Sequence, residues 1–100
     1  MPQAAPEGWT QTDSSLTRTV QRTDFVEALA WVLEIGKLAE AANHHPDIDI
    51  RYRTVHLSLS THSADNTVTN KDFTLAQRIN DLNEEALRLT KDDLRRRFAD

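Results

Sequence analysis

Three of the four histidines in this 100-residue chain stand where predicted secondary-structure elements end. His44 and His45 directly follow a helix-forming segment, and His62 follows a strand-forming segment. Side chains at the ends of elements can project from a rigid frame, and imidazole is well suited to give and take protons near neutral pH. We therefore predict that these three histidines form a site for general acid–base catalysis. The fourth, His56, falls within a strand beside serines and is interpreted as a surface residue of the sheet.

Glu40 lies one helical turn before His44 and projects onto the apolar side of the same segment. A carboxylate in that place either reaches solvent from the last turn of the helix or is held there for a purpose. Together with the negative end of the helix dipole, it would favour the charged form of the neighbouring imidazoles. A rival interpretation is a metal-dependent hydrolase with Glu40, His44 and His62 as ligands, because Glu and His four residues apart share one helix face. Spacing alone leaves both interpretations open.

The composition of the chain excludes several other chemistries. There is no cysteine, which rules out disulfides, thiolate metal sites and cysteine nucleophiles. Twelve Lys and Arg against 16 Asp and Glu give a formal net charge of −4, which argues against a general nucleic-acid binder. No apolar run approaches the ~20 residues of a membrane span, and the N-terminus lacks the pattern of a signal peptide. We therefore expect one small cytoplasmic domain without nucleic-acid or membrane partners.

The helix that precedes His44 is predicted over residues 25–43. This range lacks proline and is rich in Ala, Leu and Glu. Thr23 or Asp24 can cap its start, and Pro46 marks its end. Its apolar side chains cover a wide arc, so that part of the arc is expected to meet another subunit; they are Phe25, Val26, Ala28, Leu29, Trp31, Val32, Leu33, Ile35, Leu38 and Ala39. The opposite, polar face carries Glu27, Glu34 and Lys37.

Alternation of apolar and polar residues predicts the strands. Residues 9–12 could start a strand, and residues 15–22 alternate in the manner of a half-solvated strand. Residues 47–52 and 55–61 also alternate, but the apolar positions switch from even to odd numbers between them. Because a single straight strand cannot make that switch, we expect a tight turn or a bulge near residues 53–54.

A second helix is predicted after a loop over residues 63–69, in which Asn66 is expected to take the left-handed conformation. Thr69 and Asp72 have the spacing of a capping box at the helix start. The side chains of this helix expected to point inward are Phe73, Ala76, Ile79 and Leu82.

The predicted element order β-β-α-β-β-α gives an α+β fold, with a four-stranded antiparallel sheet and two helices packed on one face. We divide the chain into a flexible lead at residues 1–8, a folded domain at residues 9–86 and a charged, helical C-terminal extension at residues 87–100.

The stretch from Ala39 to His62 resembles the signature of the pterin-4a-carbinolamine dehydratase family. A glutamate stands four residues before His-His-Pro, and an aromatic residue, a valine and a Thr-His pair follow among alternating apolar residues. Downstream, Asp72, Leu75-Ala76 and Ile79 resemble the family's Asp-x-x-Leu-Ala-x-x-Ile segment. The resemblance extends over most of the chain.

The resemblance implies dehydration of a 4a-hydroxytetrahydropterin to the quinonoid dihydropterin, without a metal or organic cofactor. It implies that His44, His45 and His62 are the catalytic set and that Glu40 is their orienting carboxylate. It also implies that further residues bind the pterin, Trp9 by packing against the ring; they are Asn43, Ser60, Thr61, Ser63 and Trp9.

The same resemblance implies partners and an alternative function. Members of the family form homodimers and homotetramers, and the dehydration regenerates the tetrahydrobiopterin cofactor of aromatic amino acid hydroxylases, one of which could be a partner. The alternative is a non-enzymatic binding module of the same fold, of the type that stabilises a transcription-factor dimer. The intact set of three histidines favours the enzyme.

Overall fold

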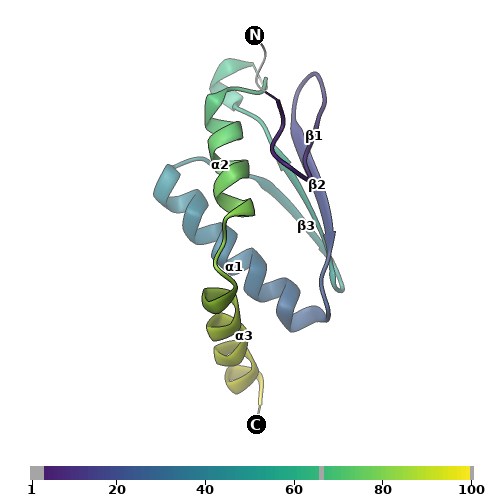
Figure 1. Ribbon diagram of the computed structural model, residues 1–100, viewed down its shortest axis with the longest axis vertical. Coiled ribbons are helices and arrows are strands. Elements are labelled where there is room, and N and C mark those ends of the chain that lie inside the picture. The colour runs from purple at the N-terminus through teal and green to yellow at the C-terminus, as the bar shows by residue number, and fades with distance from the viewer. Residues whose placement is uncertain (1–3, 66, 100) are drawn as a thin grey trace.

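The computed structural model describes residues 4–65 and 67–99 of the chain. Its elements, in chain order, are β1 (Thr10–Gln11), β2 (Leu16–Gln21), α1 (Phe25–Ala42), β3 (Asp47–Arg51), β4 (Thr54–Leu59), the short 3₁₀ turn η1 (His62–Ala64), α2 (Asn70–Asn80) and α3 (Glu84–Phe98). The strands form one antiparallel sheet in the order β1-β2-β4-β3, and the helices lie on one side of it (Figure 1). The predicted α+β class and four-stranded antiparallel sheet are confirmed. Within the described ranges, no helix is both long enough and apolar enough to cross a membrane.

The core lies between the sheet and the helices. Its side chains come from β2 and β4 on one side and from α1 and α2 on the other, and burying each large aliphatic side chain contributes about 1.5–3 kcal/mol. The buried members are Trp9, Leu16, Ala28, Trp31, Ile35, Val55, Leu57, Leu59, Phe73, Leu75, Ala76, Ile79 and Leu87. The inward face predicted for the second helix is confirmed, with Leu82 packed at the edge of this core.

The turn between β3 and β4 explains the switch of apolar positions along the sequence. Arg51 pairs with Thr54, so a two-residue hairpin loop of Tyr52 and Arg53 joins the strands, and no bulge is needed. In this register Ile50 lies opposite Val55, so even-numbered residues of one strand share a face with odd-numbered residues of the next. Tyr52 takes the left-handed conformation, with φ 57°.

The start of the second predicted helix follows its capping signal. The side chain of Thr69 and that of Asp72 form the reciprocal capping box. The left-handed residue expected in the preceding loop, Asn66, lies outside the described residues, as do residues 1–3 of the expected lead. Its neighbour Asp65 has φ 58°.

The charged C-terminal segment forms a third helix, which the predicted element order lacked. The side chain of Asn83 accepts a 2.7 Å hydrogen bond from the backbone N–H of Glu85 and caps a new helix after α2 has ended. The expected boundary at residue 87 therefore falls inside α3. Acidic residues at the start of α3 and arginines at its end suit the helix dipole, so the segment is helical in spite of its high charge.

Helix α3 packs along the face of α1 that was predicted to be polar. Glu34 of α1 is only 7 % exposed. It accepts a 2.9 Å hydrogen bond from the Thr90 hydroxyl of α3 and pairs with Lys37 at 2.7 Å. Glu34 thus lies on the polar face predicted for α1, and this face is covered because α3 supplies a polar partner.

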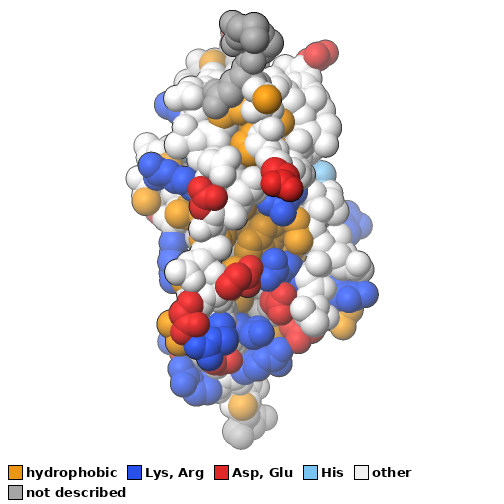
Figure 2. Space-filling model, viewed as in Figure 1, with side chains coloured by type: hydrophobic (Ala, Val, Ile, Leu, Met, Phe, Trp, Pro, Cys, Tyr) orange, Lys and Arg blue, Asp and Glu red, His pale blue; other side chains and the backbone are white. Residues whose placement is uncertain are grey.

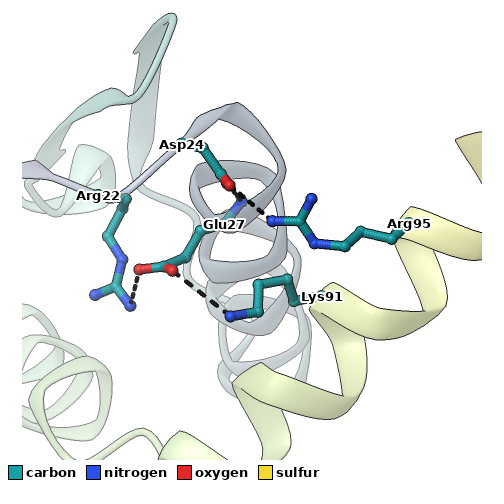
Figure 3. Close-up of polar contacts among 5 residues, drawn as sticks. All are labelled: Arg22, Asp24, Glu27, Lys91 and Arg95. Atoms are coloured by element: carbon teal, nitrogen blue, oxygen red, sulfur yellow. Dashed lines mark hydrogen bonds and ion pairs between the residues drawn. The ribbon is translucent and has the colours of Figure 1, made fainter.

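A second group of contacts ties α3 to the first turn of α1 (Figure 3). Arg95 donates to Asp24 at 2.7 Å, while Glu27 pairs with Arg22 at 3.0 Å and with Lys91 at 3.8 Å. Figure 2 shows the same alternation on the surface, with Lys and Arg side chains interleaved with Asp and Glu over the end of the molecule formed by α3. Two cations of α3, Lys91 and Arg95, thus dock it on the start of α1.

Candidate functional site

The end of α1 places the first two histidines. Asn43 takes the left-handed conformation, with φ 49°, and ends the helix one residue earlier than predicted. The backbone N–H of His44 then donates to the carbonyl of Ala39 at 3.0 Å, a common way for a helix to end. Pro46 follows and leads the chain into β3, so His44 and His45 lie in the short connection between two well-anchored elements.

A buried carboxylate holds the ring of His44. Its Nε2 lies 2.5 Å from Oδ1 of Asp72, which is fully buried, and the His44 side chain is itself only 11 % exposed. The other oxygen of Asp72, Oδ2, accepts hydrogen bonds from the Thr61 hydroxyl and from the backbone N–H of Thr69, both at 2.8 Å. Because a buried carboxylate must find partners for both oxygens, this network fixes the position of Asp72 and with it the orientation of the imidazole.

His45 is held by a carboxylate of a different character. Its Nε2 contacts Oε2 of Glu40, but both side chains are largely exposed, at 55 % and 79 %. Glu40 therefore reaches solvent from the last turns of α1, and at the same time it binds one of the histidines. An ion pair this exposed contributes little to stability, so it restrains His45 less than Asp72 restrains His44.

The chain beyond β4 places the third histidine. Thr61 is buried, and its backbone N–H donates to the carbonyl of Thr67 at 2.9 Å, which closes the loop. His62 begins the 3₁₀ turn η1 directly after this anchored threonine and is exposed. Its side chain thus stands beside the buried network without being part of it.

A cavity of about 380 Å³ lies among these residues. That volume is at the lower end of the range of small-molecule sites. All three candidate histidines line it, together with three of the residues predicted to bind substrate; these six are Asn43, His44, His45, Thr61, His62 and Ser63. The remaining lining comes from Pro46, Asp47 and Lys71.

Three predicted site residues do not line this cavity. Trp9 is 6 % exposed in the core, and its Nε1 donates to Oδ1 of Asn80 at 3.0 Å, so the structure does not bring it to the histidines. Ser60 is half-buried beside Thr61 but is not part of the lining. Glu40 reaches the cavity only through His45.

The other expectations for titratable side chains can be compared with the same geometry. In the part of the chain that the structure describes, no group of three or more His, Asp or Glu side chains is arranged to hold a metal ion, so the trio Glu40, His44 and His62 is not brought together as ligands. His56 is exposed on the sheet, with Nδ1 2.7 Å from the Thr19 hydroxyl, as expected for a surface residue.

Two contributors to the site were not assigned to it from the sequence. Asp72 was recognised as a capping residue, but its contact with His44 spans 28 positions and has no local signal. Lys71 lines the cavity from the first turn of α2, next to Asp72. Its position beside the capping residue is the one feature that could have pointed to it.

This arrangement can move protons. Where an ionised carboxylate accepts the N–H of one imidazole nitrogen, the neutral ring is left with its lone pair on the other nitrogen. In His44 and His45 it is Nε2 that faces a carboxylate, which leaves Nδ1 of each ring for exchange with a ligand. The cavity therefore offers more than one group able to act as acid or base.

The chain is similar to a known family of proteins. Residues 2–82 match the family model described as pterin 4 alpha carbinolamine dehydratase. A protein of Roseiflexus castenholzii named "Putative pterin-4-alpha-carbinolamine dehydratase" is 51 % identical over 75 residues, which are 75 % of this chain and 80 % of that protein.

Solved structures share the fold. A transcriptional coactivator/pterin dehydratase from Brucella melitensis superposes with a TM-score of 0.69 at 32 % identity, over 74 % of this chain and 80 % of that one. A pterin dehydratase-like protein described as a RuBisCO assembly factor in the alpha-carboxysome superposes with a TM-score of 0.58 at 15 % identity, over 71 % and 81 % of the two chains, and shows the fold alone. With a family model matched over most of its length and a half-identical relative, the chain belongs to the pterin 4 alpha carbinolamine dehydratase family.

Proposed function

We propose that this protein catalyses the dehydration of a 4a-hydroxytetrahydropterin to the quinonoid dihydropterin and water, with His44, His45 and His62 as catalytic residues. The observation that supports this most is the single cavity lined by all three imidazoles. In the reaction the C4a–O bond breaks, the hydroxyl leaves with an added proton as water, and a ring nitrogen loses its proton. One acid and one base are therefore needed, and no metal or organic cofactor is required.

In this proposal Asp72 and Glu40 act as positioning residues. Each accepts from Nε2 of its histidine, so that Nδ1 of His44 and of His45 exchanges the proton with the pterin. His62 would supply the third exchangeable proton from the opposite wall, and the pterin would be bound by Asn43, Thr61 and Ser63.

A rate measurement tests the proposal. Stopped-flow absorbance with chemically generated 4a-hydroxytetrahydropterin should show that the protein accelerates dehydration above the spontaneous rate. The double variant His44→Ala/His62→Ala should lose about 10²- to 10⁴-fold in rate, the usual contribution of general acid–base groups. The matched control is His56→Ala, which removes an imidazole outside the cavity and should retain the wild-type rate. A wild-type protein no faster than the double variant would contradict the proposal.

The setting proposed for this activity is tetrahydrobiopterin recycling in the cytoplasm, beside an aromatic amino acid hydroxylase that releases the hydroxylated pterin.

We also propose that the protein assembles as a homodimer or homotetramer. Phe25 and Leu33 of α1 are 43 % and 48 % exposed and, eight residues apart, lie on one helix face. Light scattering of the purified protein measures the molar mass of the assembly. If the Leu33→Glu variant forms an assembly of the same molar mass as the wild type, this face of α1 is not the subunit interface.

A second candidate function is that of a protein-binding module. It is supported by the double description of the Brucella melitensis relative as coactivator and dehydratase. The test is a variant in which all three histidines are replaced by alanine. If this variant still captures a defined partner protein, the binding function is favoured. If the same variant has also lost dehydration, the two activities belong to separate parts of the protein.

We also propose a division of the chain into a lead at residues 1–8, a dehydratase-like domain at residues 9–86 and a C-terminal extension at residues 87–100. Limited proteolysis tests this division, because an independent tail would be removed without loss of the dehydration rate.

A further inference from the structure

A second cavity, of about 350 Å³, adjoins the histidine cavity and shares His44 and Lys71 with it. Its lining includes Leu75, which is buried, and the small side chains of Ala41 and Ala42. Each of the two volumes is at the lower end of the range of small-molecule sites. A bicyclic ring held among the histidines would therefore leave the second cavity free for another part of the same ligand.

The lining of this second cavity carries positive charge. Lys71 and Arg78 are seven residues apart on α2, so they share one helix face and stand about 10 Å apart along its axis. Thr74, whose side chain is exposed, lies between them on that face. No Asp or Glu lines the cavity.

These two cations also differ from the other cations around α1 and α3. Among the described residues, neither Lys71 nor Arg78 takes part in an ion pair, whereas Arg22, Lys91 and Arg95 all pair with carboxylates. In a chain with a net charge of −4, a cavity with two cations and no carboxylate in its lining is suited to an anion.

We propose that the second cavity binds an anionic substituent of a pterin, so that the site accepts, besides the uncharged tetrahydrobiopterin form, a reduced pterin whose side chain carries a phosphate or a carboxylate, and binds it more tightly. This inference rests on the proposed function, because the ring is taken to occupy the histidine cavity. Lys71 then stands at the junction of ring and substituent, and Arg78 meets the substituent at its far end. Bonds from a guanidinium to phosphate or carboxylate are charge-assisted and can be bidentate, so the charge of the tail decides the affinity.

A titration of matched ligands tests the inference. Binding of 7,8-dihydroneopterin, of its 3′-monophosphate and of 7,8-dihydrofolate is measured by calorimetry with the wild type, Arg78→Gln and the control Arg51→Gln. Arg51 is a cation on β3 that is 83 % exposed and lines neither cavity. The wild type should bind an anionic ligand about tenfold more tightly than the neutral pterin, as charge-assisted contacts near solvent can provide. Arg78→Gln should remove most of this preference, Arg51→Gln should retain it, and added salt should weaken it.

The outcomes separate this inference from the proposed function. A preference for the monophosphate alone identifies a phosphate ester as the tail, and a preference for dihydrofolate alone identifies a carboxylate. Equal affinity for neutral and anionic ligands, or a preference that Arg78→Gln leaves unchanged, overturns the inference even if dehydration is accelerated. If none of the three ligands binds, and the protein does not dehydrate 4a-hydroxytetrahydropterin faster than the spontaneous rate, the proposed function itself fails.

Discussion

The Nε2 atom of His44 lies 2.5 Å from Oδ1 of Asp72, a carboxylate with no exposed surface. The second oxygen of the same carboxylate closes the first turn of α2 by accepting the backbone N–H of Thr69. One side chain therefore fixes the start of a helix and the orientation of an imidazole. Stability and the proposed activity can be separated at this point because the two tasks use different oxygens.

Replacement of Asp72 by asparagine should lower kcat about 10- to 100-fold with little change in KM, because the amide keeps the shape of the side chain but is a weaker, uncharged acceptor that orients the ring of His44 less firmly. Steady-state kinetics with 4a-hydroxytetrahydropterin measure this split. The structural control is Thr69→Ala, which removes the other half of the capping box, should cost about 1 kcal/mol of unfolding free energy and should leave kcat near the wild-type value. If the Asp72→Asn protein has a lower unfolding free energy but the wild-type kcat, the role of Asp72 is structural only.

Glu40→Gln should affect the rate less than Asp72→Asn, and it should leave the unfolding free energy within about 0.5 kcal/mol of the wild type. The reason is exposure, since both Glu40 and His45 are in contact with water, which screens their interaction. Urea denaturation and kinetics on the same preparations make the comparison. A rate loss at Glu40 as large as that at Asp72 would show that the exposed pair contributes as much to the rate as the buried one.

The stability of the fold should depend on pH through Glu34. Burial is the largest single influence on the pKa of this carboxyl and raises it, but hydrogen bonds from Lys37 and Thr90 together outweigh burial and hold the pKa below its ordinary value of 4.5. A carboxyl with a depressed folded-state pKa stabilises the fold above its unfolded-state pKa, and this contribution is lost as the pH falls through the folded-state value.

At neutral pH, Glu34→Gln should therefore be less stable than the wild type by about 1–2 kcal/mol, since a buried charge-assisted hydrogen bond is lost. The difference should shrink as the pH is lowered through about 4.5 and below, because the wild-type carboxyl then becomes protonated. Urea denaturation over this pH range checks the expectation. Glu85→Gln is the control, because Glu85 pairs with Arg88 at an exposed site. A difference that stays constant with pH would mean that the charge of Glu34 is not involved.

Tyr52→Asn should stabilise the protein by about 0.5–1 kcal/mol, because asparagine tolerates the left-handed conformation that the hairpin turn imposes on a bulky tyrosine. Little packing is lost, since Tyr52 is 68 % exposed. The midpoint of thermal unfolding measures the gain. Arg51→Asn, a change in the adjoining strand, should not stabilise, and a destabilised Tyr52→Asn protein would show that the tyrosine makes contacts that outweigh its strain.

Local signals in the sequence were enough for most of the fold. Asp24 accepts from the backbone N–H of Glu27 at 2.8 Å and caps α1, one of the two predicted positions. The change from even to odd apolar positions predicted the β3–β4 turn, because side-chain direction in a strand depends only on its neighbours. Such features were predictable since the residues that determine them are adjacent in the chain.

Contacts between distant segments were not predictable in the same way. A glutamate on the polar side of α1 is expected in solvent unless one knows that Thr90, 56 residues later, will face it. Trp9 was assigned to the ligand, but its indole N–H bonds to Asn80 in the core, 71 positions away. The three histidines were assigned to one site from their places at the ends of elements and from the resemblance, and in the structure all three line one cavity.

The match to the family model ends at Leu82, and helix α3 begins just after it. Helix α3 is nevertheless part of the packed fold: Leu87 and Leu94 are buried, and the Thr90 hydroxyl donates to Glu34 of α1. Melting α3 alone would remove the Thr90 hydrogen bond from that carboxylate and expose Leu87 and Leu94, so α1 and α3 are expected to open together as one cooperative unit in hydrogen exchange. The helix whose end presents His44 and His45 is thus stabilised from a region outside the shared family sequence. Substitutions there can tune the rigidity of the candidate site in evolution without altering a residue that lines it.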